Sequence, residues 1–326
     1  MKKPLLLLLT LTACLRLAAQ EGTASFAVLG LPVSSHVAGL GGENISVVED
    51  TPWAGAANPA LWSAVSDRSL GLGFMTYPDG GQWYNAQFVK AFGERHTAAF
   101  HVRMMNYGEM TETDAAGIES GTFTPRDIVV GGAYSYVLSD LWAGGAGVNL
   151  VTTNYAGYNS AAVSVDLGLN YYNPDKDLSV SLAARNIGAQ FKSPADGRTA
   201  HAPFVLQAGL TAGMVGAPIR FSVTLTDLTR WKTSDYFHPA DEALSFGKKL
   251  LNHVVVGVDI IPAEGFYLSA GYNFRRAYEL KAAGSAHGAG LTFGGGLNLR
   301  RFKLGVSYAK YHVGAASLMF SAGYAL

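Results

Sequence analysis

Charged residues are scarce in this sequence. They make up 15% of the 326 residues, and 24 Lys and Arg balance 24 Asp and Glu, so the formal net charge is zero. No polybasic block occurs anywhere along the chain. Because nucleic-acid binding depends on clustered positive charge, nucleic acid is not an expected partner.

Cysteine is nearly absent, since Cys14 is the only one. It lies in a stretch that resembles an export signal, with two lysines, an apolar run over 5–11 and a small-residue cleavage site at Leu17-Ala18-Ala19. These features predict a signal peptide over 1–19 and a mature chain without disulfide or thiol chemistry. Leu11-Thr12-Ala13-Cys14 also fits a lipoprotein processing box, so lipidation of Cys14 stays open.

Long hydrophobic runs are also lacking after the signal. No apolar stretch approaches the roughly 18 to 20 residues that a membrane-spanning helix needs. Yet 49% of the residues are apolar, with 39 glycines, 16 tyrosines and 16 phenylalanines. Since lipid cannot satisfy exposed backbone groups, a closed β-barrel is the remaining way for such an exported chain to cross a membrane.

What the sequence does contain is alternation at period two, which is typical of strands with one apolar and one polar face. Residues 163–171 are the clearest case. Their odd positions are apolar, whereas the even ones are Ser164, Asp166, Gly168 and Asn170. The same pattern recurs over 219–226, 254–260 and 266–274.

The whole pattern predicts an all-β fold, a transmembrane antiparallel barrel of about fourteen strands over residues 68–326. The expected strands are 69–77, 83–92, 96–107, 126–138, 141–153, 160–173, 177–187, 202–214, 218–230, 251–261, 265–276, 287–299, 301–311 and 315–326. Their links alternate between tight turns and long polar loops, as in barrels of the bacterial outer membrane, where the long loops face the cell exterior.

Two other classes of protein share parts of this pattern. A soluble β-sandwich also alternates, but its polar face would carry Lys, Glu and Arg, whereas Ser, Thr, Asn and Gly dominate here. A barrel enzyme such as a phospholipase stays open in principle, although no linear nucleophile or phosphate-binding motif occurs. The eight histidines lack zinc-site spacing, so we expect no catalytic site, no metal and no cofactor.

Residues 20–67 break the alternation, and we interpret them as an N-terminal plug inside the barrel. The most specific feature is Gly41-Gly42 followed by Asn58-Pro59-Ala60. The simpler interpretation is that glycines and a prolyl turn fold a compact segment in a narrow cavity.

Four charged residues fall on predicted inward positions: Asp166, Arg185, Arg220 and Asp259. They are candidate lumenal contacts for a solute. Alternatively, they hydrogen-bond to one another, to the plug or to water, since a buried charge needs a partner. Three tryptophans at strand ends, Trp83, Trp142 and Trp231, are interpreted as residues of the membrane-interface belt.

The plug pattern and the strand number resemble those of the fatty-acid-transporter-type barrels. Within that superfamily the chain is most similar to the PorV/PorQ group of the Bacteroidetes type IX secretion system, and within this group to the PorQ type. The similarity runs from about residue 24 to the end and rests on several short motifs. These motifs are Met104-Met105-Asn106-Tyr107-Gly108, Tyr171-Tyr172-Asn173-Pro174, Ala184-Arg185-Asn186-Ile187-Gly188, His253-Val254-Val255-Val256-Gly257, Gly271-Tyr272-Asn273-Phe274-Arg275-Arg276 with Glu279-Leu280, and Tyr311-His312-Val313-Gly314-Ala315.

The resemblance implies a non-enzymatic protein that anchors a PorZ-like surface protein in an attachment complex, alongside PorU and PorV, which links cargo to lipopolysaccharide. The long loops 108–125, 188–201 and 231–250 would then dock the partner, with Trp231, Tyr236 and Phe237 as aromatic anchors. Alternatively, these aromatic residues pack the loops against each other.

The competing hypothesis is transport of a hydrophobic solute through the lumen, as in the namesakes of the superfamily. A break in one strand together with an apolar pocket above the plug would favour transport. A lumen filled by polar side chains and plug would favour anchoring. Because the predicted inward positions are mostly small and polar, the sequence favours anchoring.

Overall fold

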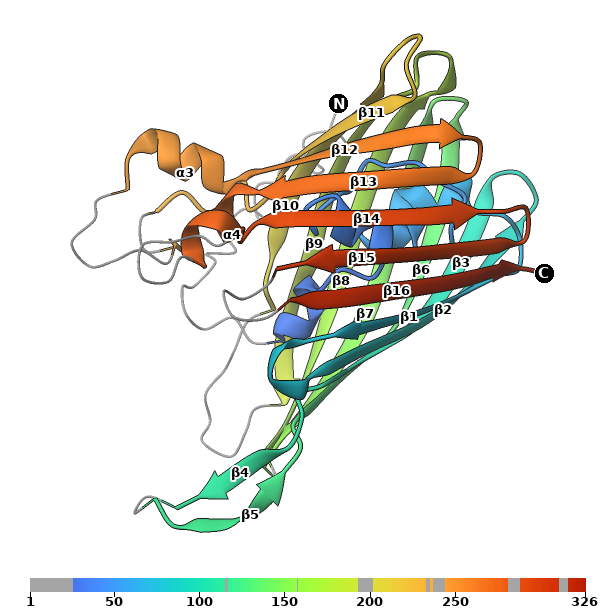
Figure 1. Ribbon diagram of the computed structural model, residues 1–326. Helices are drawn as coiled ribbons and strands as arrows, with labels where there is room; N and C mark the ends of the chain where they lie inside the picture. The colour runs from blue at the N-terminus through green and yellow to red at the C-terminus, as the bar shows by residue number, and fades with distance from the viewer. Residues whose placement is uncertain are drawn as a thin grey trace, which may run out of the picture.

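The structure is a computed structural model that describes residues 26–114, 117–156, 158–192, 202–232, 235–236, 244–280, 288–310 and 316–326. Within these ranges, fourteen antiparallel strands close into one barrel (Figure 1). The first strand of the wall pairs with the last, for example Leu72 with Ala322. The predicted all-β antiparallel barrel of about fourteen strands is confirmed.

The strands of the wall lie close to the predicted ranges. They are β1 (Ser69–Thr76), β2 (Gln82–Phe92), β3 (His96–Asn106), β6 (Arg126–Ser139), β7 (Trp142–Tyr155), β8 (Tyr158–Asn173), β9 (Leu178–Lys192), β10 (Val205–Gly213), β11 (Ile219–Leu225), β12 (Val254–Ala263), β13 (Phe266–Asn273), β14 (Leu291–Asn298), β15 (Phe302–Ala309) and β16 (Ser317–Ala325).

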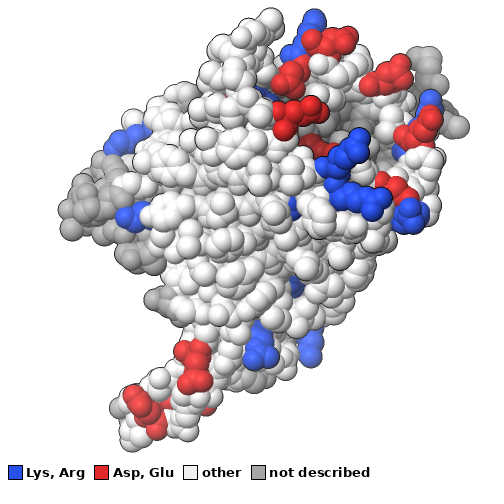
Figure 2. Space-filling model, turned by 45° about the vertical axis from the view of Figure 1, so that its right-hand side comes forward, with Lys and Arg blue, Asp and Glu red and all other residues white. Residues whose placement is uncertain are grey.

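The alternation of each strand separates an outer from an inner face. In β8, Val163 and Leu167 are exposed on the outer face, whereas Ser164 and Asn170 are buried inside. On the side shown in Figure 2, the middle of the wall has almost no charged surface, and charged residues gather towards the ends. No helix among the described residues is long and apolar enough to cross a membrane.

The two rims of the barrel differ. One carries the short links 93–95, 140–141, 174–177 with η5 (Pro174–Lys176), 214–218, 264–265 and 299–301. Both ends of the wall also meet at this short-turn rim, where the Leu326 backbone N–H donates to the Arg68 carbonyl at 3.0 Å. The other, long-loop rim carries η4 (Pro78–Gly80), β4 (Met110–Thr113), β5 (Glu119–Phe123), α3 (Phe246–Asn252) and α4 (Phe274–Glu279).

Three features of the long-loop rim differ from the sequence prediction. The expected strand over 265–276 ends early, because the Asn273 side chain accepts a hydrogen bond from the Arg276 backbone N–H and so caps α4. The expected strand over 218–230 ends at Leu225, shortly before Asp227 with its left-handed φ of 54°. The loop 108–125 contains the β4–β5 hairpin, which stands away from the barrel (Figure 1).

The barrel encloses residues 26–67, which we call the plug segment. It contains η1 (Ala27–Gly30), α2 (Ser35–Gly39), η2 (Ala54–Ala56) and η3 (Pro59–Ala64), drawn in blue within the barrel in Figure 1. Helix α2 contacts β13 to β16, and η3 contacts β3 and β6 to β8. The plug segment therefore touches opposite parts of the wall.

Candidate functional site: the plugged lumen

Two glycines turn the plug segment after α2. Gly41 and Gly42 have φ angles of 97° and 86°, a region that glycine adopts without steric cost. A Cβ atom at Gly41 would lie 2.3 Å from Val255 Cγ1, and the Gly41 backbone N–H donates to Thr292 Oγ1 at 2.9 Å. Gly41-Gly42, the first part of the predicted plug motif, therefore fixes α2 directly against β12 and β14.

The Asn58-Pro59-Ala60 half of the motif fixes η3. The Asn58 side chain accepts from the Ala60 backbone N–H at 3.1 Å, and Pro59 fits the first helical position. Asn58 Nδ2 also donates to the carbonyls of Ile45 (3.1 Å) and Leu169 (3.4 Å). This motif therefore joins the plug segment to itself and to β8.

His36, in α2, lies between two carboxylates. Its Nδ1 is 2.8 Å from Glu49 Oε2, and its Nε2 is 2.9 Å from Asp259 Oδ1. Arg220 donates to Asp259 Oδ2 from Nε (3.0 Å) and Nη2 (2.9 Å). The Tyr267 ring stacks on the imidazole with centroids 4.0 Å apart. We call these five residues the ionic cluster.

Electrostatics favour the charged form of the imidazole. Burial lowers the pKa of His36, but the attraction of Glu49 and Asp259 outweighs burial and raises the pKa to about 9. Burial raises the pKa of Glu49, yet His36 more than reverses this and holds that pKa below its usual range. Two cations therefore face two anions, and such a matched buried set holds the plug segment in place.

The four predicted lumenal charges do not form one site. Arg220 and Asp259 pair with each other in the ionic cluster. Asp166 instead accepts from the Asn186 backbone N–H at 2.7 Å and from Asn149 Nδ2 at 2.8 Å. Arg185 Nη2 donates to the carbonyl of Leu29 in η1 at 3.3 Å. All four thus contact wall or plug, and their predicted role in binding a solute stays a prediction.

The lumen is apolar at its long-loop end. Wall side chains there pack on Phe26, Val28, Leu29 and Val33 of the plug segment. We call these wall residues the apolar ring: Met75, Trp83, Met105, Val129, Val151, Ala162 and Met319. The expectation that few apolar groups line the lumen is wrong at this level, because the apolar inward positions gather at one end of seven strands.

One member of the apolar ring overturns an interpretation of the sequence. Trp83 is fully buried inside the barrel, and its Nε1 donates to the Pro32 carbonyl at 3.1 Å. The interface-belt interpretation is therefore wrong for Trp83. Trp142, by contrast, is exposed on the outer face, with its ring centroid 5.2 Å from that of Tyr171.

A cavity beside the plug segment is small. Its volume is about 20 Å³, and its lining includes Leu31, Val33, Ile45, Trp53 and Arg185. Small-molecule pockets measure roughly 300 to 1,000 Å³. In this conformation the cavity is therefore too small for an organic solute.

The wall beside the apolar ring is irregular. Between β8 and β9 the register shifts at Ala161/Ala162 and again at Val165/Leu167. Asn186 in β9 has a φ of 57°, and its backbone N–H turns to the Asp166 side chain instead of the neighbouring strand. This is a β-bulge, which bends a strand and interrupts its ladder of hydrogen bonds.

The predicted docking aromatics lie at the long-loop rim. Tyr236 is 4% exposed, and its hydroxyl is 2.8 Å from His253 Nε2. The Trp231 ring packs on His253 with centroids 4.1 Å apart, and its Nε1 donates to the Leu228 carbonyl. Phe237 lies outside the described residues. Tyr236 and Trp231 thus pack within the loops, and their docking role stays a prediction.

The chemistry of this lumen is that of packing and hydrogen bonding. In the part of the chain that the structure describes, no group of three or more His, Cys, Asp or Glu is arranged to hold a metal ion. His36 has both ring nitrogens committed to carboxylates. The sequence offered little sign of His36 and Glu49, because neither lies in an alternating strand. The second partner of His36, Asp259, is 223 residues away in the sequence.

Comparison with known proteins finds similar folds among solved structures. No family model matches the sequence, and no curated protein matches it. Among solved structures, the toluene transporter TodX of Pseudomonas putida aligns with a TM-score of 0.54 at 15% identity over 92% of this chain and 98% of TodX. A FadL homologue of Pseudomonas aeruginosa gives 0.55 at 11% identity, over 90% and 99% of the two chains.

The fold is that of FadL-type outer-membrane barrels. The monoaromatic hydrocarbon channel CymD agrees, with a TM-score of 0.51 at 13% identity over 92% of this chain and 98% of CymD. At these identities the likeness concerns the fold alone. The solute, the partners and the orientation in a membrane do not follow from it.

Proposed function

We propose that this chain is an outer-membrane barrel that admits hydrophobic solutes through its long-loop rim, which faces the cell exterior. The observation that carries the proposal is the apolar ring. Seven strands contribute buried apolar side chains to one level of the lumen, and apolar residues of the plug segment, chiefly Phe26, Val28 and Leu29, cover them. Such a surface has affinity for an apolar molecule.

The structure corresponds to the closed form of this pathway. The cavity of about 20 Å³ excludes a solute until residues 26–33 leave the apolar ring. The incoming solute would take the place of the side chains of residues 26–33, so that the apolar ring would stay covered by apolar surface. The bulge in β9 offers an exit beside the ring, because Asn186 interrupts the regular wall there.

The test is uptake by cells. A bacterial host deprived of its own barrels of this class would express the full chain, and entry of a radiolabelled monoaromatic hydrocarbon or fatty acid would be measured. We expect faster uptake than in a host with an empty vector, and a loss of that gain when Val129 and Val151 are both replaced by Asp. A matched replacement of the same two residues by Ala keeps the ring apolar and should retain uptake. Equal uptake with and without the wild-type barrel would refute the proposal.

A second candidate function is anchoring a PorZ-like surface protein in a type IX attachment complex with PorU and PorV. The β4–β5 hairpin favours the anchoring function, because this hairpin stands away from the barrel (Figure 1) and its Ile118 side chain is 65% exposed. Isolated two-stranded hairpins are marginally stable in water, and open strand edges invite pairing with another chain.

A variant without the β4–β5 hairpin distinguishes transport from anchoring. Replacing residues 110–123 by a short Gly-Ser loop leaves the apolar ring intact. Anchoring predicts that a surface protein co-purifies with the tagged wild-type barrel in stoichiometric amount and is lost with the hairpin. Transport predicts unchanged uptake in that variant. Absence of a stoichiometric partner in gently solubilised outer membranes would exclude the anchor.

A further inference from the structure

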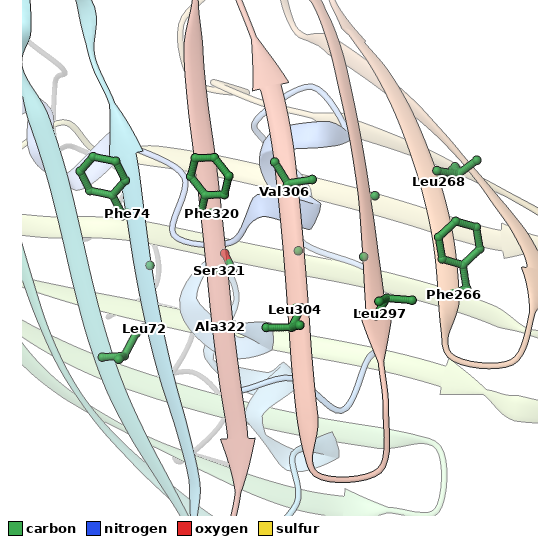
Figure 3. A pocket seen from close by; sticks show the side chains of 14 residues that line it. Leu72, Phe74, Phe266, Leu268, Leu297, Leu304, Val306, Phe320, Ser321 and Ala322 are labelled. Atoms are coloured by element: carbon green, nitrogen blue, oxygen red, sulfur yellow. The ribbon is translucent and has the colours of Figure 1, made fainter.

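The outer face of the barrel carries an open hollow of about 660 Å³ that the lumenal function does not use (Figure 3). It spans five adjacent strands, β13, β14, β15, β16 and β1, and the labelled Leu, Phe and Val side chains point outward from the wall. Two rows of directly paired residues cross it. They are Leu268, Gly295, Val306, Phe320 and Phe74 in one row, and Phe266, Leu297, Leu304, Ala322 and Leu72 in the next.

The hollow arises from small residues among large ones. Gly295 and Ala322 are the small outward positions of these rows, and Leu or Phe side chains surround them. A Cβ atom at Gly295 would already lie 3.2 Å from Leu268 Cδ2, so a larger side chain there would fill the hollow. Since its lining side chains are almost all hydrocarbon, the hollow fits a hydrocarbon chain.

Two cations stand at one end of the hollow. Arg300 and Arg301 form the turn between β14 and β15, and both are exposed. Neither side chain makes an ion pair or hydrogen bond with any residue that the structure describes. Arg301 is three residues from Leu304, and Arg300 is three from Leu297, which places their Cα atoms roughly 10 Å along the chain from those of these lining residues, within reach of a long side chain.

We propose that the hollow and this arginine pair bind one anionic glycerophospholipid. An acyl chain lies over Gly295 and Ala322, and the phosphate contacts Arg300 and Arg301, because guanidinium groups bind phosphate through paired hydrogen bonds. The inference rests on the membrane location and orientation given under the proposed function. That orientation turns the short-turn rim to the periplasmic leaflet, which selects a phospholipid over lipid A.

Native mass spectrometry of the full chain, released from detergent with added lipid, tests the site. We expect one phosphatidylglycerol to stay bound at energies that strip other lipids. R300Q/R301Q should lower its retention roughly tenfold, the loss of charge-assisted hydrogen bonds, with less effect on phosphatidylethanolamine. G295L should remove both lipids by filling the hollow.

Two control variants match these changes elsewhere on the barrel. Arg95→Gln removes an exposed arginine from another turn of the short-turn rim. Gly132→Leu adds bulk to the outer face of β6, where a Cβ atom meets only the Ala99 carbonyl oxygen at 3.6 Å. Both should retain the lipid. Shifted mobility of unheated barrels in electrophoresis shows that each variant has folded, and Ala322→Leu replaces G295L if that variant does not.

Each other outcome overturns the inference. Equal retention in all variants means that the bound lipid is not at this site. Preferred binding of lipid A places the rim in the outer leaflet, and a dimer that G295L abolishes makes the hollow a contact between two copies. Because retention is read on purified protein, these results are independent of the uptake assay that tests transport.

Discussion

The plug segment is attached to the wall in two different ways. Helix α2 is held by the ionic cluster and by backbone groups such as the Ser35 N–H, which donates to Ser321 Oγ at 3.0 Å. The preceding residues 26–33 pack against the apolar ring, and their wall contacts include no ion pair. Three single hydrogen bonds reach their carbonyls: from Arg185 to Leu29, from Trp83 to Pro32 and from Asn85 to Val33. Their helix η1 has no side-chain cap, and it follows Phe26 with a left-handed φ of 66°.

The difference teaches which part of the plug segment can move. Breaking a buried ion pair leaves uncompensated charge, which is costly. Leaving the apolar ring costs less, because an apolar molecule can take the vacated place and water can replace the hydrogen bonds to the freed carbonyls of Leu29, Pro32 and Val33. We therefore expect residues 26–33 to be the movable cover and α2 to be the fixed support.

Removing the carboxylate at the centre of the ionic cluster should have the largest effect. Asp259→Ala leaves His36 and Arg220 without their shared anion and should weaken the docking of α2 by about 3 to 5 kcal/mol. Hydrogen exchange of the amides over 35–40 should accelerate more than roughly 100-fold. Asp140→Asn is the matched control, because Asp140 is exposed in the turn between β6 and β7. Similar exchange in both variants would disprove the role of the cluster.

High pH should weaken the same attachment without a mutation. Because the pKa of His36 is raised from 6.5 to about 9, its contribution is complete below pH 6.5 and is lost as the pH rises through 9. The lowered pKa of Glu49 gives a contribution that is present above pH 4.5 and is lost as the pH falls below it. Asp259, Arg220 and Tyr267 also face the imidazole.

Exchange rates corrected for their intrinsic pH dependence would measure this. Protection of α2 should fall between pH 6.5 and 9.5, while residues 26–33 show no matching change. His36→Gln should abolish the alkaline loss. A fall of equal size in both parts of the plug segment would mean that the two attachments are not separate.

Loosening the cover should have a smaller and local effect. Leu29→Ala removes a fully buried side chain from the packing on the apolar ring and should cost about 2 kcal/mol. Exchange over 26–33 should rise by roughly 30-fold, with α2 unchanged. If the chain transports hydrophobic solutes, their uptake should increase as well. The exposed Val215→Ala change should alter neither quantity, and loss of α2 protection in Leu29→Ala would contradict the division.

The wall could be predicted from the sequence because lipid and lumen impose a strict period of two on each strand. The Arg220–Asp259 pair is part of that regular register, since the two residues face each other in β11 and β12. The rest of the lumen depends on contacts that no local pattern encodes. His36 meets Asp259 only after the barrel has closed around the plug segment.

The apolar ring was missed for a related reason. Met75, Met105 and Val129 each stand near the end of a strand whose other inward positions are mostly small or polar. Only the closed barrel brings them to one level. The helices of the long-loop rim did leave a local sign, because Ser245 and Asn273 are N-cap residues that accept hydrogen bonds from the first turns of α3 and α4.

The smallest expected effect concerns η3, whose attachment combines both types of contact. Asn58→Ala removes a cap and two donated hydrogen bonds and should destabilise η3 by about 1 to 2 kcal/mol, seen as faster exchange over 59–65. Asn58→Asp keeps the acceptor for the Ala60 N–H but loses the donors to Ile45 and Leu169. If directional bonds hold η3, the exchange rate of the Asn58→Asp variant should lie between those of the wild type and of Asn58→Ala. If the packing of Leu61 and Trp62 suffices, all three proteins should exchange at the same rate.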